Sequence, residues 1–229
     1  MFYLDNKEAR LIILQRIELL NIFLRRIRKI FGRYLFTNFI SKFFLSPTTL
    51  GKLYFSDMKN EYESIKEYID LKNKDILSIG GGLGGLEIFL NKNFDVKNFS
   101  FIERNFISKK VRYGWDSKNN EGYNDLNLLN NFLIKNGLHS SKFTIFDYDK
   151  DVLPNKKFDF VISLFSLDYH YNFDIYLAYL KKNSHSNTKI IFDTIRAEHF
   201  KDIFKEVKII KNRLDTVHKS KRIICSNFI

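Results

Sequence analysis

The chain has 229 residues, of which 45% are apolar and 16% aromatic, so it can bury the core of one α/β domain with an appendage and is not expected to be disordered. Its formal net charge of +12 would suit contact with nucleic acid, anionic lipid or an anionic substrate, although a lysine-rich solvated surface is the simpler explanation. Its single cysteine, Cys225, excludes an internal disulfide and a cysteine-rich zinc site, and it favours a reducing, cytoplasmic setting.

The longest stretch without Asp, Glu, Lys or Arg runs from Ile76 to Leu86. It is much shorter than the roughly 20 apolar residues that a transmembrane helix needs. Asp5 and Glu8 interrupt the start of the chain, so no secretory signal is expected there. We therefore expect a cytoplasmic protein without a transmembrane segment, which at most rests on the inner face of the membrane.

Residues 6–33 carry apolar side chains mostly three and four positions apart, with basic residues between them. This spacing predicts one helix, or two helices broken near Asn21. We favour packing of the apolar stripe on the domain, but a basic amphipathic helix also suits a membrane surface. The sequence SPTT at 46–49 predicts a loop, and residues 56–70 another helix. Residues 1–70 are thus expected to form a helical extension that covers the mouth of the functional site.

Residues 71–229 are predicted to form the main domain, in which short apolar strands alternate with helices. The apolar run FDFVISLF at 158–165 is typical of a strand buried on both faces of a parallel sheet. The alternation predicts an α/β fold with a doubly wound, mostly parallel, seven-stranded Rossmann-like sheet, and the last two strands should form an antiparallel hairpin because no helix fits between them. Strands are predicted at 76–79, 99–103, 143–146, 158–164, 189–193, 206–210 and 222–227, and helices at 84–92, 124–136, 173–182 and 196–204.

Half of the ten glycines lie in one turn, within ILSIGGGLGG at 76–85. An apolar strand before such a turn and a helix after it form the context in which a glycine-rich loop binds a nucleotide-like ligand. Glycine permits the tight turn and lets the ligand touch bare backbone at the helix N-terminus. A turn with incidental glycines would not need three in a row. The dinucleotide spacing of Gly80, Gly82 and Gly85 also fits a dehydrogenase, but the strands that follow leave no second nucleotide-binding half.

Acidic residues end the next two predicted strands. Glu103 ends SFIE, where a carboxylate can accept hydrogen bonds from both ribose hydroxyls, although capping of a helix is the alternative. Asp147 ends FTIFD and is followed by Tyr148.

Over roughly residues 70–229, the motifs LSIGGGLGG, SFIER, FDYDKDVLP and FDFVISLFSL resemble those of the class I S-adenosylmethionine-dependent methyltransferases. The resemblance implies that S-adenosyl-L-methionine is the cofactor, with its methionine part on the glycine turn, its ribose on the acid after the second strand and its adenine at the acid after the third. The family usually has Asp or Glu two positions before the first glycine, so Ser78 puts the expected contact to the cofactor's amino group in question. The implied cofactor-binding residues are Ser78, Gly80, Gly81, Gly82, Gly84, Glu103, Asp147, Tyr148 and Leu164.

The fourth strand leads into SLDYHY, at the carboxyl edge of the sheet where ligands bind in such folds. Histidine is the side chain that can exchange a proton near neutral pH, so His170 is a candidate base, and Asp168 can be the base itself or can orient His170. Asp168 as a helix cap and His170 as a pocket wall remain equally open. SLDYHY and the following FDIYL are similar to a segment of small bacterial sugar O-methyltransferases from surface-polysaccharide pathways. This similarity implies a hydroxyl on a sugar or a sugar-linked group as acceptor. We also expect Tyr169 and Tyr171 to bind the substrate.

The segment 111–125 holds Tyr113 and Trp115, which can stack on a sugar or on adenine, or pin the loop to the core. Asp193 and Thr194 end the fifth predicted strand and are further candidates for the pocket. The histidines lack the spacing of metal ligands, so no metal is predicted.

We therefore expect a methyltransferase that acts on a hydroxyl of a small molecule or glycan in bacterial surface-glycan biosynthesis. An RNA methyltransferase that uses the basic surface is one alternative, but the chain has no motif for amino nucleophiles and no RNA-binding module. A non-catalytic S-adenosylmethionine-binding protein is the other, and Ser78 is the best argument for it. The sequence does not predict the oligomeric state.

Overall fold

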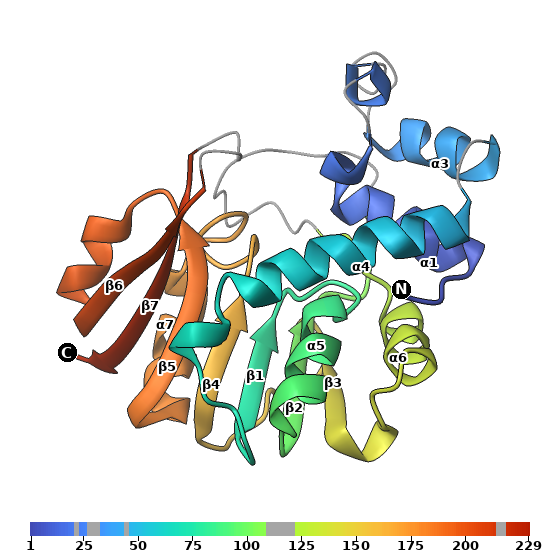
Figure 1. Ribbon diagram of the computed structural model, residues 1–229. Coiled ribbons are helices and arrows are strands. Elements are labelled where there is room, and N and C mark those ends of the chain that lie inside the picture. The colour runs from blue at the N-terminus through green and yellow to red at the C-terminus, as the bar shows by residue number, and fades with distance from the viewer. Residues whose placement is uncertain (21–22, 27–32, 44–45, 109–121, 214–218) are drawn as a thin grey trace.

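The structure is a computed structural model that describes residues 1–20, 23–26, 33–43, 46–108, 122–213 and 219–229 (Figure 1). The named helices are α1 (Asn6–Gln15), η1 (Ile17–Leu19), α3 (Arg33–Phe43), α4 (Pro47–Glu63), η2 (Lys66–Tyr68), α5 (Gly85–Phe94), α6 (Leu126–Lys135), η3 (Ser140–Lys142), α7 (Asp174–Asn183) and η4 (Ala197–Asp202), where η marks a 3₁₀-helix. The strands are β1 (Asp75–Ile79), β2 (Asn98–Glu103), β3 (Phe143–Asp147), β4 (Phe158–Ser163), β5 (Ser184–Thr194), β6 (Phe204–Asn212) and β7 (Lys221–Phe228).

The strands form one sheet in the order β3-β2-β1-β4-β5-β7-β6. The first five in this order are parallel, and β7 is antiparallel to both β5 and β6. The doubly wound, mostly parallel Rossmann-like sheet and its C-terminal antiparallel hairpin are therefore confirmed. The strand order reverses between β1 and β4, and ligands of open α/β sheets bind beyond the carboxyl ends of the strands at such a reversal.

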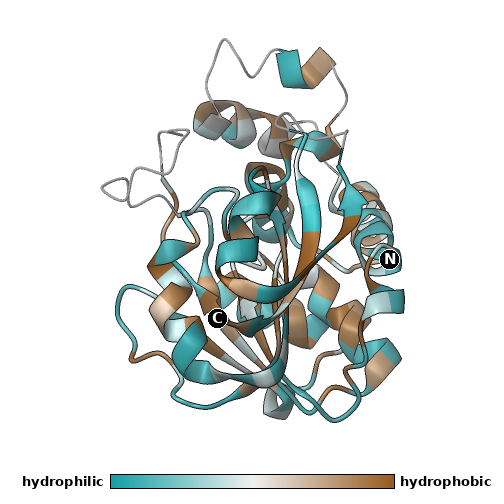
Figure 2. Cartoon of the chain, turned by 90° about the vertical axis from the view of Figure 1, so that its left-hand side faces the viewer, coloured by the Kyte–Doolittle hydropathy of each residue, from teal (hydrophilic) through white to brown (hydrophobic). Residues whose placement is uncertain are grey.

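Apolar side chains on the two faces of the sheet form two cores. Ile76 and Phe101 belong to the core that includes α1, α4, α5 and α6, whereas Leu77 and Ile102 belong to the core that includes α7 and η4. Neighbouring residues of a strand point to opposite faces, so each buried strand supplies both cores. Figure 2 shows brown, hydrophobic segments on the strands and teal, hydrophilic residues on the outer parts of the helices.

The loop predicted at 46–49 is wrong, because α4 already begins at Pro47. The Oγ of Ser46 accepts a hydrogen bond from the backbone N–H of Thr49, and Pro47 lies at the first helical position, where its missing N–H leaves no bond unmade. Ser-Pro here starts a helix and does not interrupt one. The helix predicted to begin at residue 56 is the second half of α4.

The N-terminal extension shares its core with the main domain. α1 is capped by Asp5 and ends at Gln15, so the helix predicted over 6–33 is shorter than expected; Asn21 lies outside the described residues. Phe2 is buried in the same core as α5 and β1. α1 and α3 lie beyond the ends of the strands to which the arrows of β1 and β4 point (Figure 1).

The helix predicted at 196–204 is the shorter 3₁₀-helix η4. The connection between Thr194 and Phe204 is short, and a 3₁₀-helix rises further per residue than an α-helix, so it spans the gap with fewer residues. None of the described helices combines the length and hydropathy that crossing a bilayer would require.

Candidate active site

The glycine turn joins β1 to α5 in a backbone conformation that is unfavourable for residues with a side chain. Gly80, Gly82 and Gly84 have φ angles of 66°, 67° and 76°, in the left-handed region that favours glycine. A Cβ at Gly80 would lie 2.0 Å from the Oγ of Ser166, and one at Gly82 would lie 2.8 Å from the Oε1 of Gln15. The turn therefore presents bare backbone to its surroundings.

Glu103 ends β2 directly beside this turn. Its Oε1 accepts a hydrogen bond from the backbone N–H of Gly82 at 2.8 Å, and the amide of Asn124 donates to the carbonyl oxygen of the same glycine at 2.8 Å. Burial raises the pKa of Glu103 to about 8, although the hydrogen bonds from Asn124 and the Gly82 N–H lower it. A carboxyl group that is difficult to ionise thus lies against the glycine turn.

Asp147 lies opposite Glu103 in the parallel register of β2 and β3, so two acidic side chains end neighbouring strands. The backbone N–H of Tyr148 donates to the Glu103 carbonyl oxygen at 2.8 Å, and this bond fixes the chain just after Asp147. The guanidinium of Arg104 lies 4.9 Å from the centroid of the Tyr148 ring. The edge formed by β1, β2 and β3 is therefore lined by glycine backbone, two carboxyl groups and an aromatic ring.

Ser78, on β1 before the turn, is fully buried and donates a hydrogen bond from its Oγ to the Oε1 of Glu87 at 2.6 Å. Glu87 lies in the first turn of α5 and is 2% exposed. Burial raises the pKa of Glu87 above its usual value. The serine at the position where an acid was expected is thus paired with an acid from the next helix.

Asp168, in the loop after β4, is fully buried and has a positive φ of 59°. Its carboxylate accepts hydrogen bonds from Arg196 Nη2 at 2.6 Å and from the Thr194 hydroxyl at 2.5 Å. Arg196 also donates to the side chain of Asn172 at 2.8 Å. These contacts tie the loop after β4 to the end of β5 and fix the conformation of SLDYHY.

His170 is exposed at the tip of this loop, and its backbone N–H donates to the carbonyl oxygen of Ser166 at 2.8 Å. Its ring contacts the ring of Tyr169 edge-on, with centroids 5.1 Å apart. Tyr171 is half-buried, and the guanidinium of Arg104 lies 5.7 Å from its ring centroid. Arg104 therefore connects the rings of Tyr148 and Tyr171, so the ends of β3 and β4 meet at one edge.

Five further residues were singled out from the sequence. Leu164 is buried in the core at the end of β4. Tyr113 and Trp115 lie outside the described residues. Asp193 and Thr194, which were expected to face the pocket, are fully buried, with Asp193 ion-paired to Arg222 on β7.

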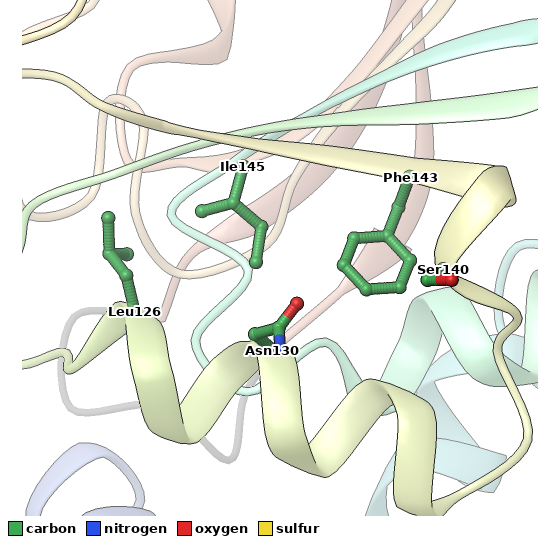
Figure 3. A pocket seen from close by; sticks show the side chains of 5 residues that line it. All are labelled: Leu126, Asn130, Ser140, Phe143 and Ile145. Carbon is green, nitrogen blue, oxygen red and sulfur yellow. The ribbon is translucent and has the colours of Figure 1, made fainter.

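A surface cleft of about 330 Å³ lies away from this edge, between α6 and β3 (Figure 3). The cleft is lined by Leu126, Asn130, Ser140, Phe143 and Ile145.

Among the described residues, no group of three or more His, Cys, Asp or Glu side chains is arranged to hold a metal ion.

Sequence reasoning missed three polar side chains around the turn: Gln15, Glu87 and Asn124. Gln15 donates to the Tyr123 carbonyl oxygen at 2.7 Å and to Asn124 Oδ1 at 3.2 Å, so α1 closes over the turn. Only Glu87 had a local signal, because it is a charged residue within the apolar run LGGLEIFL. Contacts such as that of Gln15 join residues far apart in the chain and leave no local pattern.

No protein-family model matches the chain, and a search of curated proteins found no match. Among solved structures, the chain is similar to a candidate O-methyltransferase from Nostoc punctiforme, with a TM-score of 0.53 and 11% identity over 77% of this chain and 61% of that one. It is also similar to a methyltransferase from Pyrococcus furiosus, with a TM-score of 0.50 and 14% identity over 75% of this chain and 83% of that one. The chain thus spans less than two thirds of the Nostoc protein. These likenesses show that the chain shares the Rossmann-like fold of these two structures.

Proposed function

We propose that the chain is a methyltransferase that uses S-adenosyl-L-methionine. The observation that carries this proposal is the hydrogen bond between the Gly82 N–H and the Glu103 carboxyl group, which joins the glycine turn after β1 to the acid that ends β2. Bare backbone at Gly80, Gly81 and Gly82 suits the aminoacyl end of the cofactor, because a Cβ at each would overlap a neighbouring side chain.

The remaining donors and acceptors also fit this cofactor. Glu103 would accept hydrogen bonds from the ribose hydroxyls, as an acid at the end of the second strand does in nucleotide-binding sheets. Asp147 would accept from the adenine amino group. Tyr148, Leu164 and the backbone of Gly84 would complete the binding surface, and Ser78 would act through Glu87.

The bound cofactor would supply an electrophilic methyl group. The chain would align the acceptor hydroxyl with that group and exclude water, which lowers the barrier of a direct displacement. As the new O–C bond forms and the methyl–sulfur bond breaks, His170 would take the hydroxyl proton. Asp168 would position His170, because its ion pair with Arg196 fixes the loop that carries the histidine.

For the acceptor, we propose a hydroxyl group on a sugar or a sugar-linked molecule in bacterial surface-glycan biosynthesis. Tyr169 and Tyr171 flank His170 at the edge of the sheet, and aromatic rings suit the apolar faces of sugars. Tyr113 and Trp115 would add to this aromatic surface. The single cysteine supports a cytoplasmic site of action.

Calorimetric titration with S-adenosylhomocysteine tests the cofactor proposal. We expect saturable binding by the wild-type chain, loss of binding in Glu103→Ala, and unchanged binding in Glu206→Ala, an exposed change on β6. Transfer of a labelled methyl group to a panel of sugars then tests the acceptor. If the wild-type chain binds neither S-adenosylhomocysteine nor S-adenosylmethionine, the proposal is refuted.

The net charge of +12 supports a second candidate acceptor, RNA. RNA binding through phosphate contacts weakens steeply with salt, because neutralising phosphates releases counterions. RNA affinity that does not change with salt would count against this candidate.

Exposed apolar side chains beside the basic N-terminal helices support peripheral contact with an anionic membrane face. Leu35 and Phe39 are 66% and 56% exposed on α3, one helical turn apart, and Phe23 is 70% exposed. Co-sedimentation with anionic vesicles but not with neutral ones is the expected result.

A further inference from the structure

The side chain of Glu87 is buried without being fully satisfied. It lies in the first turn of α5, within an apolar stretch of the helix, and is 2% exposed. Its Oε1 accepts the hydrogen bond from the Ser78 hydroxyl at 2.6 Å. Its Oε2 has no hydrogen-bond partner within the part of the chain that the structure describes. Buried polar atoms are nearly always hydrogen-bonded in folded proteins, so this oxygen indicates a role beyond packing.

This carboxyl group lies directly against the glycine turn. A Cβ at Gly81 would lie 2.9 Å from the Glu87 Oε1 and 2.6 Å from the Ser78 Oγ. On the next residue of the turn, the N–H of Gly82 donates to Glu103. Two buried carboxyl groups, from α5 and from β2, therefore flank consecutive residues of the turn.

Among the residues that the structure describes, no basic side chain forms an ion pair with Glu87. Arg16 is close enough to lower the pKa of Glu87, but its Nη1 donates to Asp57 at 2.9 Å. Tyr54, from α4, packs against Gly85 at the start of the same helix and carries no positive charge. Glu103 is itself acidic, and Glu87 helps to raise its pKa. Two buried acids of this kind favour a ligand with a positive charge placed on the turn.

We propose that Glu87 binds the α-ammonium group of the cofactor and that Ser78 positions its carboxylate. The acid that the methyltransferase pattern places on the strand before the turn is then supplied by the helix after it. This inference rests on the proposed function and adds to it a binding residue that no motif identified. It also removes the strongest argument for a non-catalytic protein, since the loss of the acid at position 78 is compensated.

The test compares two ligands that differ only at the aminoacyl end. S-adenosylhomocysteine carries the ammonium group, whereas 5′-methylthioadenosine keeps the nucleoside and the thioether but lacks the amino acid. In Glu87→Gln we expect binding of S-adenosylhomocysteine to weaken about tenfold, because a charge-assisted hydrogen bond becomes a neutral one. Binding of 5′-methylthioadenosine should stay as in the wild type.

A matched control is Glu8→Gln, which alters another fully buried glutamate, on α1 and with partners other than the turn. Glu8 is fully partnered, by Lys135 Nζ at 2.7 and 2.9 Å and by the Asp5 N–H at 2.7 Å. We expect Glu8→Gln to lower the melting temperature and leave both affinities unchanged. Glu87→Gln should keep or raise the melting temperature, because it removes a buried carboxyl group that forms no ion pair with any described residue.

The outcomes separate this inference from the proposed function. If the wild type binds neither ligand, the proposed function fails, and this inference with it. If the wild type binds both but Glu87→Gln binds S-adenosylhomocysteine as tightly as before, or loses both ligands equally, only the role of Glu87 is overturned. A fall in the melting temperature of Glu87→Gln without a selective loss of S-adenosylhomocysteine would assign Glu87 to folding alone.

Discussion

Arg222 on β7 and Asp193 on β5 face each other across the antiparallel strand pair and form a bidentate ion pair in which both side chains are fully buried. Arg222 also donates to Glu61 on α4, and Arg213 donates to the other oxygen of Glu61 at 2.6 Å. Two buried cations and two buried anions thus join the antiparallel edge of the sheet to the helix that precedes the main domain.

Replacing Arg222 by Met should lower the free energy of unfolding by about 3–5 kcal/mol, because Asp193 and Glu61 lose a buried partner. Burial acts to raise the pKa of Glu61, but Arg222 and Arg213 hold it at about 2. This depressed pKa stabilises the fold above the unfolded value near 4.5, and the stabilisation disappears as the pH falls toward 2. Urea denaturation of the wild type and of Arg222→Met at neutral pH measures the difference in the free energy of unfolding. The exposed Arg26→Met is the control, and equal stability of the two variants would contradict the prediction.

Replacing Glu103 by Gln should change how stability depends on pH. Burial raises the pKa of Glu103 to about 8, so the folded state binds a proton that the unfolded state releases near pH 4.5. The wild type should therefore lose stability as the pH rises from about 4.5 to 8, with no further loss from this group above pH 8. Glu103→Gln cannot ionise and should lack this contribution. Thermal unfolding of both proteins at pH 5 and pH 8 tests this prediction. If the melting temperatures of the wild type and Glu103→Gln change equally between the two pH values, Glu103 is not a buried, neutral carboxyl group.

Much of the fold follows from local pattern. Each predicted strand of the sheet is found, and continuous apolar runs such as Phe158–Ser163 favour a strand that is buried on both faces. The predictions are wrong where a single side chain decides which secondary structure a segment forms. Ser46 followed by Pro47 starts α4, although serine and proline also mark loops.

The candidate site is predictable only along the strand ends. Gly80 follows β1, and Glu103 and Asp147 end β2 and β3. These strands neighbour one another in the sheet in sequence order, so the three residues lie at one edge. Gln15 reaches the turn from α1, more than 100 residues before its partner Tyr123. The ion pair between Asp168 and Arg196 likewise depends on where β5 ends relative to β4, and no local spacing reveals it.

Asp168 and His170 should respond differently to substitution. Asp168→Asn removes the charge of a fully buried carboxylate that is paired with the partly exposed Arg196, and it should lower the free energy of unfolding by about 1–3 kcal/mol. His170→Asn changes an exposed side chain and should alter stability by less than about 0.5 kcal/mol. If His170 is the base, methyl transfer in His170→Asn should fall by about 10²–10⁴ while S-adenosylhomocysteine binds normally. Unchanged transfer would remove His170 from the mechanism.

Glycine at position 82 should be required for binding, and glycine at position 137 only for folding. Gly82→Ala forces a side chain into a φ of 67° and toward Gln15, within the turn that would bind the cofactor. Gly137→Ala meets the same kind of backbone penalty at a φ of 95°, but its Cβ contacts nothing within 4 Å. Both should lose about 1 kcal/mol of stability. Calorimetry should show a loss of S-adenosylhomocysteine binding only in Gly82→Ala, and equal binding by the two variants would exclude the turn as the site.

Phe2 should contribute as much to the stability of the main domain as a core residue of that domain does. Its side chain is 3% exposed, and its ring centroid lies 5.4 Å from that of Tyr54 and 5.2 Å from that of Phe132, on α4 and α6. Phe2→Ala leaves a cavity between these helices and should cost about 3–5 kcal/mol, whereas Phe23→Ala, at a position 70% exposed, should cost less than about 0.5 kcal/mol. Because residues 1–70 and 71–229 share this core, calorimetric unfolding should show one transition that Phe2→Ala shifts as a whole. Two transitions, of which only one moves, would establish the extension as a separate domain.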